Sequence, residues 1–319
     1  NLDFHKKISI KNFVPNYKIR KLRKSLGKEI SEKESTILDI LENLIYRKNY
    51  LEISEESKQI IEYSINIGAI DFLIENIKFT EQKSSQNSGQ FSESYITFIL
   101  GQEPYLKDLS SQRIFSIMKN IEIDQKNCTF KISDNCINKE GIDLLKKEKI
   151  NTLIDPNQKI NDGYKNLRSN LKFNLNKNIN IYSAWIEGSL AACEEKISNN
   201  KIYWIWELGE PISRKLKGKS VDNFYKKDLN KVPIESLLSS IWFEIERLKA
   251  NFADFIVVSN PDSKKYISST FDIKKDKIVD NLDFHKKISI KNFVPNYKIR
   301  KLRKSLGKEI SEKESTILD

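Results

Sequence analysis

Two glutamates close to two tryptophans are the residues whose types and spacing come nearest to a site for chemistry. Glu207 and Glu210 follow Trp204 and Trp206 within one short stretch of the chain. Carboxylates accept hydrogen bonds from hydroxyl groups, and tryptophan offers a large apolar ring for stacking. We interpret Glu207 and Glu210 as candidate catalytic acids that would hold the hydroxyls of a sugar stacked on the tryptophans. The sequence leaves the alternative open that both tryptophans belong to the core.

Further candidates follow expected strands, at the positions where ligands bind in open α/β sheets. The candidate substrate-binding residues are Gly101, Gln102, Arg113, Trp185, Glu187, Ser259 and Asn260. Arg113 could meet a phosphate at the start of a helix, or could be a solvated side chain. Ser259-Asn260-Pro261 could contact a ligand or could cap a helix, since Asn supplies a capping oxygen and Pro presets φ for the first turn.

These positions depend on short apolar strands that alternate with helices. We expect strands at 95–100, 128–132, 150–154, 179–183, 202–206, 255–259 and 277–279, and helices at 110–121, 138–148, 160–172, 187–197, 233–251 and 261–270. This alternation predicts βαβ units and a parallel sheet. Strands that are apolar almost throughout indicate a sheet covered on both faces. The predicted fold is therefore α/β, a doubly wound parallel Rossmann-like sheet over residues 94–280.

An all-helical segment is expected before this sheet, over residues 1–79. Ser31 and Glu34 form a capping box ahead of apolar residues at helical spacing. A second helix is expected from about Ser54 to Gly68, where the glycine would stop it. Residues 80–93 are polar and rich in Ser and Gln, so they are interpreted as a flexible linker between the two domains.

An exact repeat changes the charge of the chain. Residues 281–319 have the same sequence as residues 1–39, and each copy carries ten basic and five acidic residues. The net charge of +11 falls to +6 when one copy is subtracted, which weakens the case for a nucleic-acid partner. The basic run from Lys18 to Lys24 could bind nucleic acid or anionic lipid, or could be a solvated helix. A tandem array and an assembly artefact both explain the repeat.

The three cysteines Cys128, Cys136 and Cys193 have neither CxxC nor metal-binding spacing. An odd and sparse set of this kind fits buried thiols in a reducing compartment. No run of 18 consecutive apolar residues predicts a membrane-spanning helix, and no signal peptide is visible. We therefore expect a cytoplasmic protein.

The stretch 246–280 resembles the end of the N-terminal domain of GT-B glycosyltransferases, in which an "ADxVxxVS" phrase precedes a short helix and a "K-I" phrase. The matching residues are Ala253, Asp254, Phe255, Ile256, Val257, Val258, Ser259, Ile273, Lys277, Ile278 and Asn281. Residues 110–118 resemble the family's first helix, and residues 179–211 resemble its strand–helix–strand. Residues 293–307 resemble the phrase that opens its second domain. The resemblance covers about residues 94–307.

The resemblance implies an enzyme that moves a sugar from a nucleotide-sugar donor to a glycan or lipid-linked acceptor. It implies that residues 94–280 are the acceptor-side half, that residues 281–319 begin a truncated second region, and that the enzyme needs neither a cofactor nor a bound metal. A peripheral contact with a membrane is a further expectation, and a nucleic-acid partner is not favoured.

The chain also departs from the family pattern. Trp206 precedes Glu207 where the family often has a histidine, Gly101 stands alone where a glycine pair is usual, and no donor-binding domain follows Gly307. These departures favour an alternative, a non-catalytic Rossmann-like module of a tandem-repeat or scaffold protein.

Overall fold

The computed structural model describes residues 10–50, 53–81, 91, 96–100, 128–132, 151–153, 164–165, 179–216, 221–225 and 227–280. The expected helices at 110–121 and 138–148, most of the one at 160–172, and the repeated segment 281–319 lie outside this part of the chain. The chain folds into two compact units: one comprises residues 1–85, 161–164 and 210–251, and the other comprises residues 86–160, 165–209 and 252–319. Each unit is described by itself.

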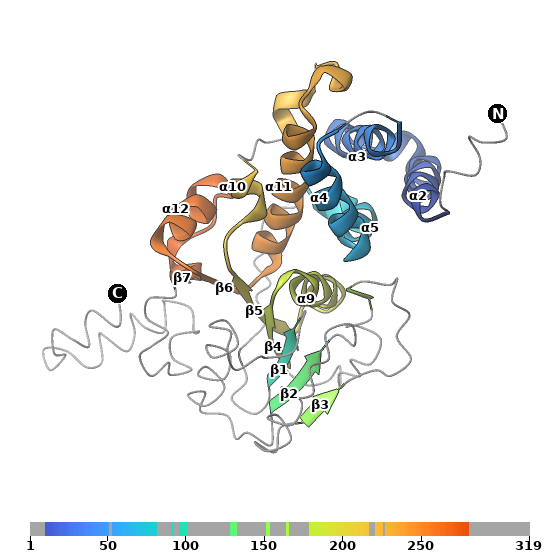
Figure 1. Cartoon of the computed structure of the whole chain (residues 1–319). Helices are drawn as coiled ribbons and strands as arrows, with labels where there is room; N and C mark the ends of the chain where they lie inside the picture. The colour runs from blue at the N-terminus through green and yellow to red at the C-terminus, as the bar shows by residue number, and fades with distance from the viewer. Residues whose placement is uncertain are drawn as a thin grey trace, which may run out of the picture. The chain divides into compact units, whose positions relative to one another are not determined.

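The sheet unit contains seven parallel strands: β1 (Ile96–Leu100), β2 (Cys128–Ile132), β3 (Asn151–Leu153), β4 (Ile179–Ala184), β5 (Ile202–Leu208), β6 (Phe255–Val258) and β7 (Ile278–Asp280). Their order in the sheet is β3-β2-β1-β4-β5-β6-β7, visible in Figure 1. The chain therefore builds the sheet outward from β1 in one direction and then returns to add β4 on the other side. This confirms the predicted α/β Rossmann-like fold.

Two α-helices and the 3₁₀ helix η7 (Lys275–Lys277) accompany the sheet in the described part of this unit. Helix α9 (Ile186–Ser198) packs on β1, β4 and β5, and α12 (Pro261–Thr270) packs on β6 and β7. Every residue of β4, β5 and β6 is buried, so both faces of this part of the sheet are covered. The apolar character of these strands explains why the sequence pattern locates them to within two residues.

The helical unit begins with α2 (Ile10–Leu26), the 3₁₀ helix η1 (Gly27–Glu29), α3 (Glu32–Tyr50), α4 (Glu55–Asn66), α5 (Ala69–Glu75) and η2 (Ile77–Phe79). The predicted capping box is confirmed, because Glu34 N donates to Ser31 Oγ (3.1 Å) and Ser31 N donates to a Glu34 carboxylate oxygen (2.9 Å). The predicted stop at Gly68 is confirmed as well, since its φ of 79° ends α4 before α5 begins.

The same unit is completed by later residues, which form α10 (Ile212–Lys215), η5 (Val221–Phe224), η6 (Leu229–Lys231) and α11 (Ile234–Phe252). Helix α4 lies alongside α11 (Figure 1), where Trp242 Nε1 donates to Ser64 Oγ at 3.2 Å. Arg47 also donates to Val232 O at 2.6 Å. Residues 210–251 thus pack with the N-terminal helices, although they lie between β5 and β6 in the chain.

Candidate functional site

Strands β2 and β3 lie on one side of β1, and β4 and the later strands lie on its other side. The order of the strands therefore reverses between β1 and β4, which pair from Ile96 with Asn180 to Leu100 with Ala184. Ligands of open α/β sheets bind outside the carboxyl ends of the strands at such a point. Gly101 and Gln102, which follow β1, lie outside the described residues, as does Arg113. Trp185 follows β4 and Glu187 lies in the first turn of α9, so both occupy the positions expected from the sequence.

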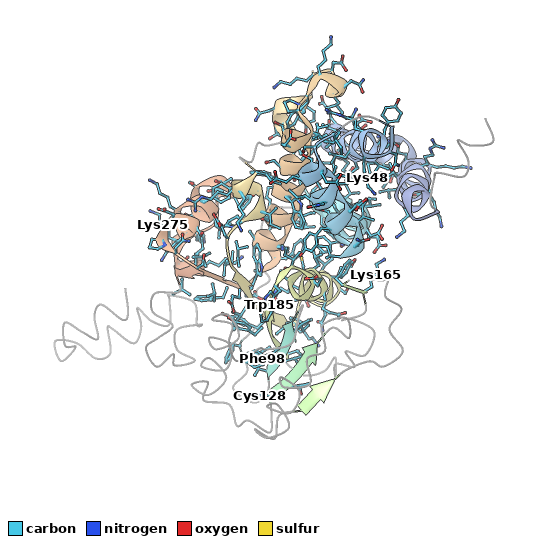
Figure 2. All side chains as sticks on the ribbon, viewed as in Figure 1. Lys48, Phe98, Cys128, Lys165, Trp185 and Lys275 are labelled. Carbon is cyan, nitrogen blue, oxygen red and sulfur yellow. The ribbon has the colours of Figure 1, made fainter. Side chains whose placement is uncertain are left out.

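Trp185 has an unusual backbone conformation. Its φ is 57° and its ψ is 175°, a combination that costs a residue with a side chain on the order of 1–3 kcal/mol. The residue turns the chain from β4 into α9, and its partly buried ring lies near the junction of the sheet and that helix (Figure 2). Trp185 is the N-cap residue of α9, but its side chain forms no capping hydrogen bond. Glu187 supplies a negative charge to the first turn of this helix. That charge interacts favourably with the helix dipole.

Glu207 is buried in the sheet, with 4% of the residue exposed. The Tyr182 hydroxyl on β4 donates a hydrogen bond to its carboxylate. Tyr182 pairs with Ile205 in the register, so Tyr182 and Glu207 point to the same face of the sheet. The Tyr182 ring in turn packs on Phe98 of β1 with ring centroids 5.4 Å apart. The candidate acid is therefore held inside the sheet unit by its neighbours.

Trp204 and Trp206 belong to the core, which was one of the two interpretations left open by the sequence. They are 0% and 1% exposed, and their rings stack with centroids 6.1 Å apart. Trp204 Nε1 donates to Ser183 Oγ at 2.8 Å. Because successive strand residues point to opposite faces, the Trp206 ring and the Glu207 carboxylate lie on opposite faces of the sheet. A sugar cannot stack on Trp206 and bind to Glu207 in this arrangement.

Glu210 belongs to the helical unit, where it forms an ion pair with Lys215 at 3.4 Å between exposed side chains. In the sheet unit, Ser259 Oγ donates to Gly209 O at 3.2 Å. Asn260 caps α12, because its Oδ1 accepts from Ser263 N at 2.8 Å and Pro261 occupies the first turn. The helix-cap interpretation of this stretch is thus confirmed. The catalytic role of Glu210 and the roles of Ser259 and Asn260 in binding substrate stay predictions.

A buried group of charges that the sequence interpretation missed lies at the opposite end of the sheet, where the parallel strands begin. Lys196 at the end of α9 lies 2.7 Å from Asp254, which directly precedes β6. Burial raises the pKa of the Asp254 carboxyl, against the nearby Lys196 charge, which lowers it. Burial also lowers the pKa of Lys277, just before β7, to about 8. Two of the residues that carry the glycosyltransferase resemblance, Asp254 and Lys277, therefore belong to this group rather than to the candidate site.

A second buried carboxylate was also missed, this time in the helical unit. Glu246 on α11 accepts hydrogen bonds from Ile212 N at 2.6 Å and from the backbone N and the hydroxyl of Ser213. Burial raises the pKa of Glu246, and these hydrogen bonds together with Lys249 oppose the rise. The carboxylate fixes the start of α10 against α11. No spacing in the sequence relates residues 212 and 213 to residue 246, so the pairing had no local signal.

The comparisons with known proteins found no matching family model, no matching curated protein and no matching solved structure. Within the described ranges, no helix has the length and apolar character needed to cross a membrane. Those same ranges contain no group of three or more His, Cys, Asp or Glu side chains that could hold a metal ion. The geometry of the sheet unit is therefore the basis for assigning a function.

Proposed function

We propose that this chain is a glycosyltransferase-like protein whose sheet unit is the acceptor-side half. A sugar would move from a nucleotide-sugar donor to a hydroxyl of a glycan or of a lipid-linked acceptor in the cytoplasm, with a peripheral membrane contact. The observation that carries the proposal is the order of the parallel strands, because it brings Trp185 and the start of α9 to the point where ligands of such sheets bind.

The residues at this point supply suitable chemistry for a sugar. The Trp185 ring is partly buried, so part of it can contact the apolar face of a ring-shaped ligand, while Glu187 beside it can accept hydrogen bonds from hydroxyls. The first N–H groups of α9 favour groups that carry negative charge. In this proposal Glu207 supports the site from within the sheet through Tyr182.

Trp185 also provides a way to test the proposal. Of the four tryptophans, Trp204, Trp206 and Trp242 are at most 1% exposed, whereas Trp185 is partly exposed. Acrylamide should therefore quench Trp185 almost alone. A sugar that binds beside Trp185, between the carboxyl ends of β1 and β4, should protect this fluorescence from acrylamide quenching. The protection should be seen in the unmutated protein and in Trp242→Phe. Trp185→Phe should lose the quenchable fluorescence, and its affinity for the sugar, measured by calorimetry, should be reduced.

The ligands for this experiment are an alkyl glucoside as acceptor mimic and UDP-glucose and GDP-mannose as donors. An acceptor-side half should bind the alkyl glucoside and bind either donor only weakly, with a dissociation constant on the order of 1 mM or above. Donor binding in the micromolar range by isothermal titration calorimetry would refute the acceptor-side assignment.

A second candidate function is a non-catalytic Rossmann-like module. It is favoured by the internal contacts of both candidate acids, since Glu207 is buried against Tyr182 and Glu210 pairs with Lys215. A fold of this kind supports many functions and decides none of them. Absence of protection of Trp185 by every sugar and nucleotide sugar tested would favour this module over the enzyme.

A further inference from the structure

The helical unit contains a surface that receives part of the repeated sequence. Ile19 on α2 and Ile37 and Leu38 on α3 are each 0% exposed, and α2 packs on α3 and α5. These three residues belong to the segment 1–39, which we call the first copy. The residues that receive it come from the remainder of α3, from α5 and from α11, all within the same unit.

The charges on the two sides of this surface are complementary. Lys18 lies 2.7 Å from Asp71 of α5, Arg23 lies 3.5 Å from Glu42 of α3, and Lys33 lies 3.3 Å from Glu244 of α11. In each of these pairs the cation belongs to the first copy and the carboxylate to the receiving side, while Arg23 also pairs with Asp39 of the first copy at 2.5 Å. The Glu244 side chain is only 1% exposed, and its charge is compensated within the protein by Arg247 of the same helix at 2.7 Å and by Lys33 of the first copy.

The chain carries every one of these docking side chains twice. Residues 281–319, the second copy, repeat the first copy letter for letter, so that Lys298, Ile299, Arg303 and Lys313 have the same spacing as Lys18, Ile19, Arg23 and Lys33. Apolar fit and ion pairing depend on the side chains and their spacing, not on their place in the chain. The receiving surface therefore offers the second copy the same side-chain contacts as the first, whereas only the first copy is joined to the rest of α3.

We propose that this surface is an interaction site for residues 281–319 of another molecule of this same protein. The second copy of one chain takes the place of residues 1–39 in another, and the two chains join head to tail. Exchange of an identical segment is a low-cost route to assembly, and a head-to-tail contact continues into a ring or a filament. This inference is independent of the proposed function, because it concerns only the helical unit.

The covalent connection decides which copy occupies the surface. Helix α3 runs without a break from the first copy into its receiving half, from Glu32 to Tyr50. A tethered segment acts at an effective concentration on the order of millimolar for short linkers, so the first copy is favoured in dilute protein. Exchange should increase with protein concentration, and it should dominate when the docking of the first copy is weakened.

The duplication allows a matched experiment on the full chain. Ile19→Asp buries a charge in the first copy, Ile299→Asp makes the same change in the second copy, and a third variant carries both. Molar mass is measured by light scattering over a wide range of protein concentration. Ile19→Asp should form species of at least twice the mass of the monomer, Ile299→Asp should remain monomeric, and the double variant should lose the large species.

The proposal is wrong if Ile19→Asp and the double variant have the same mass at every concentration. The milder pair Ile19→Ala and Ile299→Ala keeps the test valid if the charged substitutions unfold the unit. Asp71→Lys provides a further comparison, because it places a lysine opposite Lys18 and breaks their ion pair. Adding Lys18→Glu to this variant should restore the contact within one chain and give monomers. Lys298→Glu should instead restore it between chains and give assemblies, and equal masses for these two double variants would overturn the proposal.

Discussion

The ammonium group of Lys196 lies 2.7 Å from Asp254 Oδ2, and both side chains are 4% exposed. The same carboxylate oxygen accepts a hydrogen bond from Trp204 N at 2.8 Å, and Lys196 also donates to Ile202 O at 2.5 Å. One ion pair therefore joins the end of α9 to the beginnings of β5 and β6. Its position at the amino-terminal ends of the strands, away from the end where ligands bind, indicates a role in stability rather than in binding.

Asp254→Asn should lower the free energy of unfolding by about 3–5 kcal/mol, because it leaves the Lys196 charge buried without its partner. Urea unfolding followed by circular dichroism measures this loss. Lys215→Met is the matched control, since its exposed pair with Glu210 should contribute about 0–1 kcal/mol. An Asp254→Asn variant no less stable than Lys215→Met would contradict the assigned role.

Lys277 should make the protein more stable as the pH rises from about 8 towards 10.5. Burial lowers its pKa from 10.5 to about 8 in the folded protein, so between these values the unfolded chain binds more protons than the folded one. Lys277→Met should remove this rise, which is on the order of 1–2 kcal/mol for a partly buried group. Urea unfolding at several pH values checks this, with the exposed neighbour Lys275→Met as control.

Gly68→Ala should destabilise the helical unit by about 1–3 kcal/mol, because a side chain at its φ of 79° is strained. A methyl group there would also lie 2.9 Å from the Tyr164 ring. Gly209→Ala is a suitable comparison, since nothing lies within 4 Å of a methyl group at that position. Thermal unfolding of both variants measures the difference, and equal losses would exclude a special role for Gly68.

Tyr182→Phe should cost about 1–3 kcal/mol, because the buried Glu207 carboxylate loses a hydrogen-bond donor. A double-mutant cycle with Glu207→Gln separates this hydrogen bond from packing of the Tyr182 ring on Phe98. We expect the two substitutions to be coupled in urea unfolding. Additive effects would mean that the tyrosine stabilises the sheet through its ring alone.

The strands were predictable because a buried parallel sheet requires apolar runs that short-range pattern reading detects. The caps at Ser31 and Asn260 were predictable for a similar reason, since capping depends on residues three positions apart. The opposite orientation of Trp206 and Glu207 was not predicted, because the expected strand ended at residue 206. β5 runs on to Leu208, so Glu207 lies within the strand and alternates with Trp206 between its two faces. That alternation alone is enough to exclude a shared site for these two side chains.

Other relationships had no local signal. Lys196 and Asp254 come together only when β5 and β6 pair, and Glu246 meets Ser213 only when α11 packs on α10. The packing of Trp242 against Ser64 likewise joins residues far apart in the chain. Periodicity describes which face of an element is buried but does not identify the partner that covers it, so these contacts could not be derived from spacing.

The place of β1 in the middle of the sheet has a consequence for the order of folding. β4, α9 and β5 follow one another directly along the chain and contact one another, so they can form early with little loss of loop entropy. β1 can pair on one side with β2, the next strand along the chain, but its other side must wait for β4, which is made much later. On a ribosome, β1 would leave the exit tunnel well before β4 exists, and the edge that β4 later covers would be open to the wrong partner for that time.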